Sequence, residues 1–206
     1  MALRAVLDLL FPAQCASCNA IGSGFCDACA PRAQPLFARF PMLCVRAFGL
    51  YEGPLRAAVL ALKDGRRDVA EALGSRAAPL VERNSVLVPI PTTSRRLRAR
   101  GVDGVAAVAR SAAAIAGATV LAALEQQSGD AQRGRSRVER LAASGRFACS
   151  AGVAARRVTL FDDVCTTGST LRDCAAAVRR AGGIVEDAVV LALTKSGSSW
   201  EIAMER

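Results

Sequence analysis

The sequence contains no histidine, and only two of its 27 basic residues are lysines, Lys63 and Lys195. Without histidine the chain can form neither a Ser-His-Asp nor a Cys-His catalytic arrangement, and it has no histidine-ligated metal site. Any chemistry must therefore come from carboxylates, hydroxyls, cysteines, arginines and the peptide backbone.

Long apolar runs are also missing. The uncharged, alanine-rich stretch from Ser111 to Leu124 has 14 residues, whereas a membrane-spanning helix needs roughly 20. Asp8 interrupts the one apolar stretch near the N-terminus, so we expect no secretory signal. These features predict a cytoplasmic protein in a reducing compartment, with no membrane insertion.

Positive charge is concentrated in the middle of the chain. Residues 94–157 hold twelve arginines against four acidic residues, a surplus of +8 in a formal net charge of +9. This concentration predicts a polyanionic partner, either a phosphorylated small molecule or nucleic acid, and a solvated arginine-rich surface is the alternative. Aromatic residues are only 4% of the chain, so no stacking platform for single-stranded nucleic acid is apparent.

Four of the eight cysteines form two closely spaced pairs, Cys15 with Cys18 and Cys26 with Cys29. This spacing is typical of a knuckle in which four thiolates hold one structural Zn²⁺, and disulfides or unrelated free thiols are the alternatives. The same N-terminal region shows little periodicity. We therefore expect a zinc-binding knuckle over residues 1–45 and a second domain over residues 46–206.

The second domain alternates apolar strands with helical patterns. Gly65 separates two predicted short helices. After them, each predicted strand is followed by a helix, except the last strand, which is the final predicted element. In order, the predicted elements are helices around Leu55–Leu62 and Val69–Leu80, strand Val86–Ile90, helix Val102–Ala116, strand Val158–Phe161, a helix through Leu171 and Val178, and strand Ile184–Leu193. This order predicts an α/β fold with a parallel, helix-covered sheet.

The strongest chemical signal follows the strand that starts at Val158. Two acids, Asp162 and Asp163, come at its carboxyl end, where open α/β sheets bind ligands. Hydroxyl residues around Gly168 then open a helix, whose free N–H groups and dipole favour a phosphate, and glycine lets the main chain approach it. A ribose between phosphate and acids would give the carboxylates hydroxyls to accept from. A capped helix with two solvated acids is the alternative.

The string LFDDVCTTGSTL, residues 160–171, resembles the phosphoribosyl diphosphate motif of the type I phosphoribosyltransferases. The resemblance implies the type I phosphoribosyltransferase fold and a glycosyl transfer in which Mg²⁺ accompanies the pyrophosphate. It also implies that Asp162 and Asp163 bind ribose at the reacting centre. The 5-phosphate would be bound by Thr166, Thr167, Gly168, Ser169 and Thr170.

Nearly the whole chain is similar to the ComF family, which is linked to DNA uptake. The similarity is carried by YEGPLR (51–56), LK-x-G (62–65), VPIP (88–91), RRLRARG (95–101) and the spacing of Gln132, Ser136 and Arg140. This resemblance implies that the turn of Pro89, Ile90 and Pro91 holds pyrophosphate. Additional positive charge would come from Lys63 or from Arg95, Arg96, Arg98 and Arg100.

Two functions follow from these patterns. The first is transfer of a phosphoribosyl group from phosphoribosyl diphosphate, or binding of a related sugar phosphate. The second is a non-catalytic accessory role in competence, with the knuckle and the arginine-rich face binding single-stranded DNA or a competence protein. Residues 100–104 favour the second function, because they read RGVDG where ComF proteins usually read RGFNQ.

Overall fold

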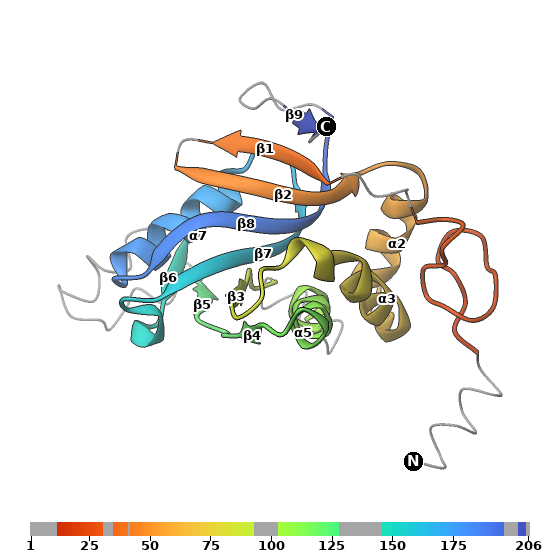
Figure 1. Ribbon diagram of the computed structural model, residues 1–206, viewed down its shortest axis with the longest axis horizontal. Helices are drawn as coiled ribbons and strands as arrows, with labels where there is room; N and C mark the ends of the chain where they lie inside the picture. The colour runs from red at the N-terminus through yellow and green to blue at the C-terminus, as the bar shows by residue number, and fades with distance from the viewer. Residues whose placement is uncertain are drawn as a thin grey trace, which may run out of the picture.

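Figure 1 shows a computed structural model of the chain, which describes residues 12–30, 35–40, 42–92, 103–127, 146–195 and 202–204. The strands are β1 (Leu36–Phe40), β2 (Leu43–Leu50), β3 (Val86–Pro89), β4 (Thr119–Val120), β5 (Leu124–Gln126), β6 (Phe147–Cys149), β7 (Arg157–Cys165), β8 (Ile184–Leu193) and β9 (Ile202–Met204). The helices are α2 (Gly53–Lys63), α3 (Arg67–Ala77), α5 (Gly104–Ala116) and α7 (Ser169–Arg180), with 3₁₀ turns η1 (Ala78–Leu80) and η3 (Ala151–Val153).

One mixed sheet organises the molecule, with the strand order β4-β3-β7-β8-β2-β1-β9. The strands from β4 to β2 run parallel to one another, whereas β1 pairs antiparallel with both β2 and β9. Strands β5 and β6 form a separate antiparallel pair. The predicted α/β class with a mostly parallel sheet is confirmed.

Helices cover both faces of the sheet because its central strands are apolar on both faces. In β7, Leu160 packs in a core cluster with α7, whereas the adjacent Phe161 packs in a second cluster with α2, α3 and α5. Successive side chains of a strand point to opposite faces, so one strand joins both clusters. The β5–β6 pair lies on the same face as α7.

The predicted elements match the structure closely, with two differences. Helix α5 begins at Gly104, where the Asp103 carboxylate accepts a hydrogen bond from the Ala106 N–H at 3.2 Å, and residues 101–102 lie outside the described part. Strand β7 does not end at Asp162 but continues to Cys165. It continues because β8 extends alongside, pairing Val190 with Asp162 and Leu193 with Cys165.

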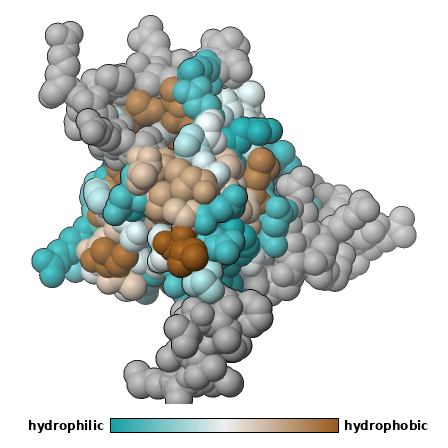
Figure 2. Space-filling view, turned by 90° about the vertical axis from the view of Figure 1, so that its right-hand side faces the viewer, coloured by the Kyte–Doolittle hydropathy of each residue, from teal (hydrophilic) through white to brown (hydrophobic). Residues whose placement is uncertain are grey.

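The cysteine-rich segment, residues 12–30, packs against α3 at one end of the molecule (Figure 1). Its Cys15 and Phe25 are fully buried, and a Cβ on Gly24 would lie 2.5 Å from the Asp68 carbonyl. Figure 2 looks onto this end and shows apolar groups near the centre with hydrophilic groups around them. The segment therefore shares its core with the sheet domain.

The expected boundary between residues 45 and 46 needs correction. It falls inside β2, whose Val45 pairs with Ala188 of β8 and with Ala38 of β1. Strands β1 and β2 therefore belong to the sheet, and the knuckle ends before Leu36. Strand β1 has only five residues, too few for a clear alternating pattern in the sequence.

Within the described residues, each helix is too short or too polar to cross a bilayer.

Candidate functional site

The chain reverses its direction of travel across the sheet between β3 and β7. From β3 it passes through α5 to β4 on one side, and from β7 it passes through α7 to β8 on the other. The two helices lie on opposite faces, in different core clusters. Such a switch point leaves a crevice at the carboxyl ends of the two strands, where parallel sheets bind ligands.

A cavity of about 280 Å³ occupies this crevice. Six residues predicted from the sequence to form the site line it, namely Lys63, Ile90, Pro91, Asp162, Asp163 and Thr170. They come from α2, the end of β3, β7 and the first turn of α7. Residues that are distant in sequence thus meet around one space at the switch point.

The two acids of β7 have different surroundings. The Asp163 carboxylate forms an ion pair with the Lys63 ammonium at 3.1 Å and accepts a hydrogen bond from the Val164 N–H at 2.6 Å. The half-buried Asp162 accepts from the Asp163 N–H at 2.9 Å. Burial, and then the neighbouring Asp163 charge, raise the pKa of Asp162 to about 8.

This difference changes what the acid pair can do. At neutral pH a carboxyl with a pKa of about 8 is mostly protonated, so Asp162 can donate a hydrogen bond as well as accept one. Lys63 offsets the charge on Asp163. The pair therefore repels a nearby phosphate less than the two carboxylates expected from the sequence.

The loop after β7 presents the N-terminus of α7. Gly168 is the N-cap residue and has the left-handed φ of +70°, so it supplies no side-chain oxygen. No acidic residue lies in the first turn of the helix. The Thr167 hydroxyl accepts weakly from the Ser169 N–H at 3.4 Å, and Thr166, Thr167 and Ser169 are exposed. The positive end of the helix dipole is thus open to an anion.

The structure gives a reason for Gly168 other than the expected close approach of a ligand. A Cβ at this position would lie 2.5 Å from Cε1 of Phe40, a side chain of β1, rather than against a ligand. The glycine is needed because the turn is left-handed and because the Phe40 ring packs directly on it. The sequence gives no sign of this contact, which joins residues 128 positions apart.

The VPIP turn is only partly at the cavity. Ile90 and Pro91 line it, and the Ile90 N–H donates to the Phe161 carbonyl at 2.8 Å, which fixes the turn to β7. Pro89 is buried and pairs in register with Phe161, inside the sheet. Of the three proposed pyrophosphate ligands, Pro89 is therefore structural.

The predicted arginines Arg95, Arg96, Arg98 and Arg100 lie outside the described residues, as do Gln132, Ser136 and Arg140. Described residues near the ends of these two segments line the cavity. Thr92 and Gly104 line the cavity beside the first segment, and Gln126 and Arg146 line it beside the second.

Arg146, Gln126 and Phe147 are site residues that sequence reasoning missed. The Arg146 guanidinium donates to the Thr170 hydroxyl at 3.0 Å, pairs with Asp173 at 3.3 Å and lies 5.4 Å from the centre of the Phe147 ring. In the sequence Arg146 is one of twelve arginines in a basic stretch. Only the pairing of β5 with β6 brings it to the cavity.

The four cysteines of the knuckle form a cluster that could hold a metal ion such as zinc. The sulfur atoms of Cys15, Cys18, Cys26 and Cys29 all lie within 4.8 Å of one another, and those of Cys18 and Cys26 are 3.6 Å apart. A tetrahedral site with Zn–S bonds of about 2.3 Å requires sulfurs roughly 3.8 Å apart. All eight cysteines are free, so the disulfide alternative is not found.

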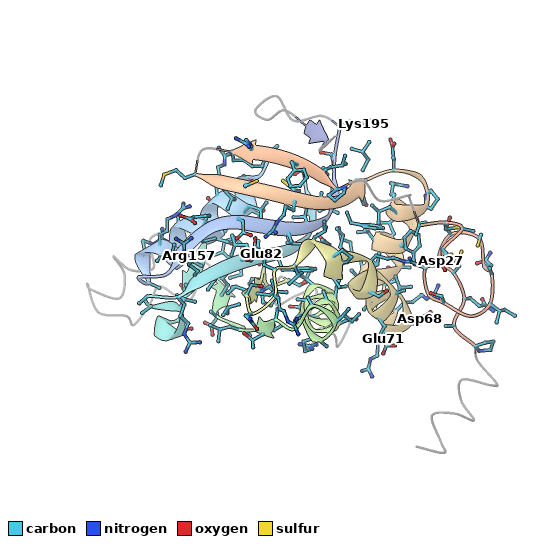
Figure 3. All side chains as sticks on the ribbon, viewed as in Figure 1. Asp27, Asp68, Glu71, Glu82, Arg157 and Lys195 are labelled. Atoms are coloured by element: carbon cyan, nitrogen blue, oxygen red, sulfur yellow. The ribbon has the colours of Figure 1, made fainter. Side chains whose placement is uncertain are left out.

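Backbone donors favour the thiolate form of one member of this cluster, Cys15. Burial alone raises the pKa of Cys15, but N–H groups of Cys18, Cys26 and Ser17 outweigh it and bring the pKa to about 6. Two arginines hold the knuckle against α3. Arg76 of α3 pairs with Asp27 of the knuckle. Arg66, the N-cap residue of α3, donates to the Gln14 carbonyl and pairs with Asp68. Asp27 and Asp68 lie where knuckle and helix meet (Figure 3).

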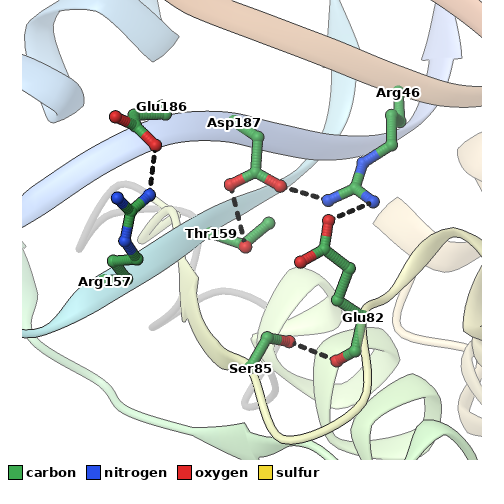
Figure 4. A network of polar contacts seen from close by, with 7 residues as sticks. All are labelled: Arg46, Glu82, Ser85, Arg157, Thr159, Glu186 and Asp187. Carbon is green, nitrogen blue, oxygen red and sulfur yellow. Dashed lines mark hydrogen bonds and ion pairs between the residues drawn. The ribbon is translucent and has the colours of Figure 1, made fainter.

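A second polar network lies at the opposite, amino-terminal edge of the strands (Figure 4). Arg46 of β2 pairs with Asp187 and, at 3.1 Å, with Glu82, while the Thr159 hydroxyl donates to Asp187 at 3.0 Å. A cavity of about 510 Å³ adjoins it and is larger than the one at the switch point. The network pairs its charges with one another, so we interpret it as a structural link between β2, β7 and β8.

Comparison with protein-family models and with curated proteins finds no match for this chain.

Proposed function

We propose that the cavity at the switch point binds the ribose 5-phosphate group of phosphoribosyl diphosphate or a related sugar phosphate. The observation that carries this proposal is the meeting of Lys63, Asp162, Asp163 and Thr170 around one space at the open end of α7. The phosphate takes the first turn of α7, where N–H groups and the dipole favour it. The ribose hydroxyls reach the acid pair.

We further propose phosphoribosyl transfer to an acceptor, in the manner of the ComF-type proteins that the sequence resembles. Pyrophosphate leaves ribose C1 with the electron pair of the C–O bond, and the acceptor supplies the pair for the new bond to C1 and loses its proton. The transition state resembles an oxocarbenium ion, so positioning and electrostatics supply most of the catalysis. Asp162 and Asp163 would hold the sugar, while Lys63 would balance the charge of the departing pyrophosphate.

A magnesium ion would have to arrive with the pyrophosphate. Among the described residues the cysteine cluster is the one group of three or more metal-ligating side chains, and Asp163 is already paired with Lys63 at 3.1 Å. The cavity residues therefore do not form a magnesium site of their own. We propose zinc as the ion of the cysteine cluster, where it would be structural.

The second candidate is a non-catalytic accessory protein that binds DNA or a competence protein. One observation favours it. Asp103 belongs to the stretch RGVDG, which differs from the RGFNQ usual in ComF proteins, and its charge adds to the rise in the pKa of Asp162. Asp103 therefore lies close enough to repel an anionic leaving group. Asp103 also caps α5, which gives it a structural reason to be there. Release of pyrophosphate from phosphoribosyl diphosphate would separate the first candidate from this one.

The test of the binding site removes the acid pair. In Asp162→Asn/Asp163→Asn the side chains keep their size, but the charged acceptor at Asp163 and the carboxyl group of Asp162 are lost. The lost bond to Asp163 alone should cost about 1.5–3 kcal/mol of ribose 5-phosphate binding. Free phosphate should bind no worse. Asp64→Asn, an exposed acid next to Lys63, is the matched control. Calorimetry that finds ribose 5-phosphate affinity unchanged in the double variant would reject the ribose assignment.

A further inference from the structure

Arg146 is a cation at the cavity that lies outside the recognised motif. It precedes β6, and its carbonyl accepts from the Gln127 N–H at 3.0 Å, which ties its backbone to the end of β5. Its side chain lines the cavity and remains 48% exposed, so a ligand can reach it. Lys63 enters from α2, on the other face of the sheet.

The guanidinium is held in one place by three neighbours. Nη2 donates to the Thr170 hydroxyl at 3.0 Å, Nε pairs with Asp173 at 3.3 Å, and the Phe147 ring centre is 5.4 Å from Cζ. Thr170 and Asp173 belong to the first two turns of α7. A planar guanidinium fixed in this way has fewer rotamers to lose when it binds a phosphate.

This position is electrostatically unusual for an arginine. Cations are unfavourable at the N-terminus of a helix, because the dipole is positive there. No acidic residue in the first turn of α7 offsets the charge, and Asp173, one turn further, is itself 48% exposed. The dipole and Arg146 together therefore favour an anion at the cavity end of α7.

We propose that Arg146 contacts the phosphate of the bound sugar phosphate and sets the preference for phosphorylated over unphosphorylated ribose, with Phe147 as its positioning residue and Asp173 as an ion-pair partner whose charge competes with the phosphate. This inference rests on the proposed function. Arg146 supplies a charge-assisted, directional contact from the β5–β6 side, while the N–H groups at the start of α7 bind the same phosphate.

The test compares calorimetric titrations of the full chain with ribose 5-phosphate and with ribose. Arg146→Gln should weaken ribose 5-phosphate binding roughly tenfold or more and leave ribose unchanged. Arg146→Lys keeps the charge without the planar fork and should lie between. The matched control is Arg172→Gln. Arg172 is an exposed arginine of α7, close in sequence to Thr170 and Asp173, and it does not line the cavity.

Asp173→Asn separates phosphate binding from a purely structural role. If Arg146 only fastens β6 to α7, Asp173→Asn should weaken ribose 5-phosphate as Arg146→Gln does; if Arg146 binds phosphate, losing the Asp173 charge should leave the affinity unchanged or raise it. Wild-type protein that binds no ribose 5-phosphate would overturn both this inference and the proposed function. Wild-type binding with Arg146→Gln equal to Arg172→Gln would overturn the inference alone.

Discussion

Asp162 illustrates how burial changes the chemistry that a residue type suggests. An acid at the end of a strand predicts a charged acceptor, but burial and Asp163 raise its pKa to about 8. The sequence shows that two acids are adjacent but not how far each is buried. The protonation state of Asp162 could therefore not be predicted from the sequence. If both acids were fully exposed to solvent, each would be charged at neutral pH.

The shifted pKa of Asp162 predicts a specific pH dependence of stability. The folded protein binds the Asp162 proton more tightly than the unfolded chain, whose pKa is near 3.8, so the contribution is stabilising below that value and is lost as pH rises through about 8. Asp162→Asn should therefore lose less stability between pH 4 and 8 than wild type does. Urea unfolding at several pH values measures this, with Asp64→Asn as control. Parallel profiles for wild type and Asp162→Asn would contradict the shift.

Gly168 gives a second prediction at the scale of one residue. Alanine there must adopt φ near +70° and place its Cβ 2.5 Å from the Phe40 ring, so Gly168→Ala should destabilise the protein by about 1–3 kcal/mol and weaken ribose 5-phosphate and phosphate alike. Chemical denaturation and calorimetry measure the two effects.

A double-mutant cycle with Phe40→Leu shows which part comes from the ring. If the ring causes the overlap, the loss from Gly168→Ala should be smaller in the Phe40→Leu background. Additive losses would assign the whole effect to the left-handed backbone. Gly152→Ala is the control, because its Cβ would meet only the Ser150 hydroxyl at 3.6 Å.

At the scale of elements, the knuckle is joined to α3 rather than appended to it. Cys15 and Phe25 contribute to the same core cluster as Val69 and Leu73 of α3. A metal held by the four cysteines would then stabilise the α3 face of the sheet domain as well as the knuckle. This follows because metal binding and folding of a ligand loop are coupled.

Removing the metal should therefore lower the melting temperature of the whole chain. We expect one zinc per chain by elemental analysis, and a fall in melting temperature of about 5–10 °C after chelation or in Cys18→Ser. Cys149→Ser is the control, because Cys149, which is half-buried where Cys18 is exposed, lies outside the cluster. Purified protein that is free of metal and melts unchanged after chelation would contradict the metal site.

Much of the element pattern could be predicted because it is local. Periodic apolar residues predicted α2 and α3, and the ten-residue run from Ile184 to Leu193 predicted β8 with the bounds that the structure has. The misses are non-local: β1 is recognised only through its pairing with β2, and β7 is prolonged only by the length of β8. Arg146 reached the site for the same reason, through the partner strand of β6.

At the scale of the whole molecule, the topology decides where the chemistry gathers. Reversal between β3 and β7 opens one crevice, and α2, α7 and the start of β6 bring Lys63, Thr170 and Arg146 to its walls. The larger cavity at the opposite edge adjoins charges that are already paired. Within the described residues, an open helix N-terminus, a half-buried acid pair and two cations are found together only at the switch point.

The central claim is that this crevice recognises a phosphorylated ribose. Its most direct test is a calorimetric titration of wild-type protein with phosphoribosyl diphosphate and Mg²⁺, set beside a titration with single-stranded DNA at the same salt concentration. The account predicts saturable binding of one phosphoribosyl diphosphate per chain, competed by ribose 5-phosphate. Binding of DNA with no heat from phosphoribosyl diphosphate or ribose 5-phosphate would contradict it and favour the accessory role.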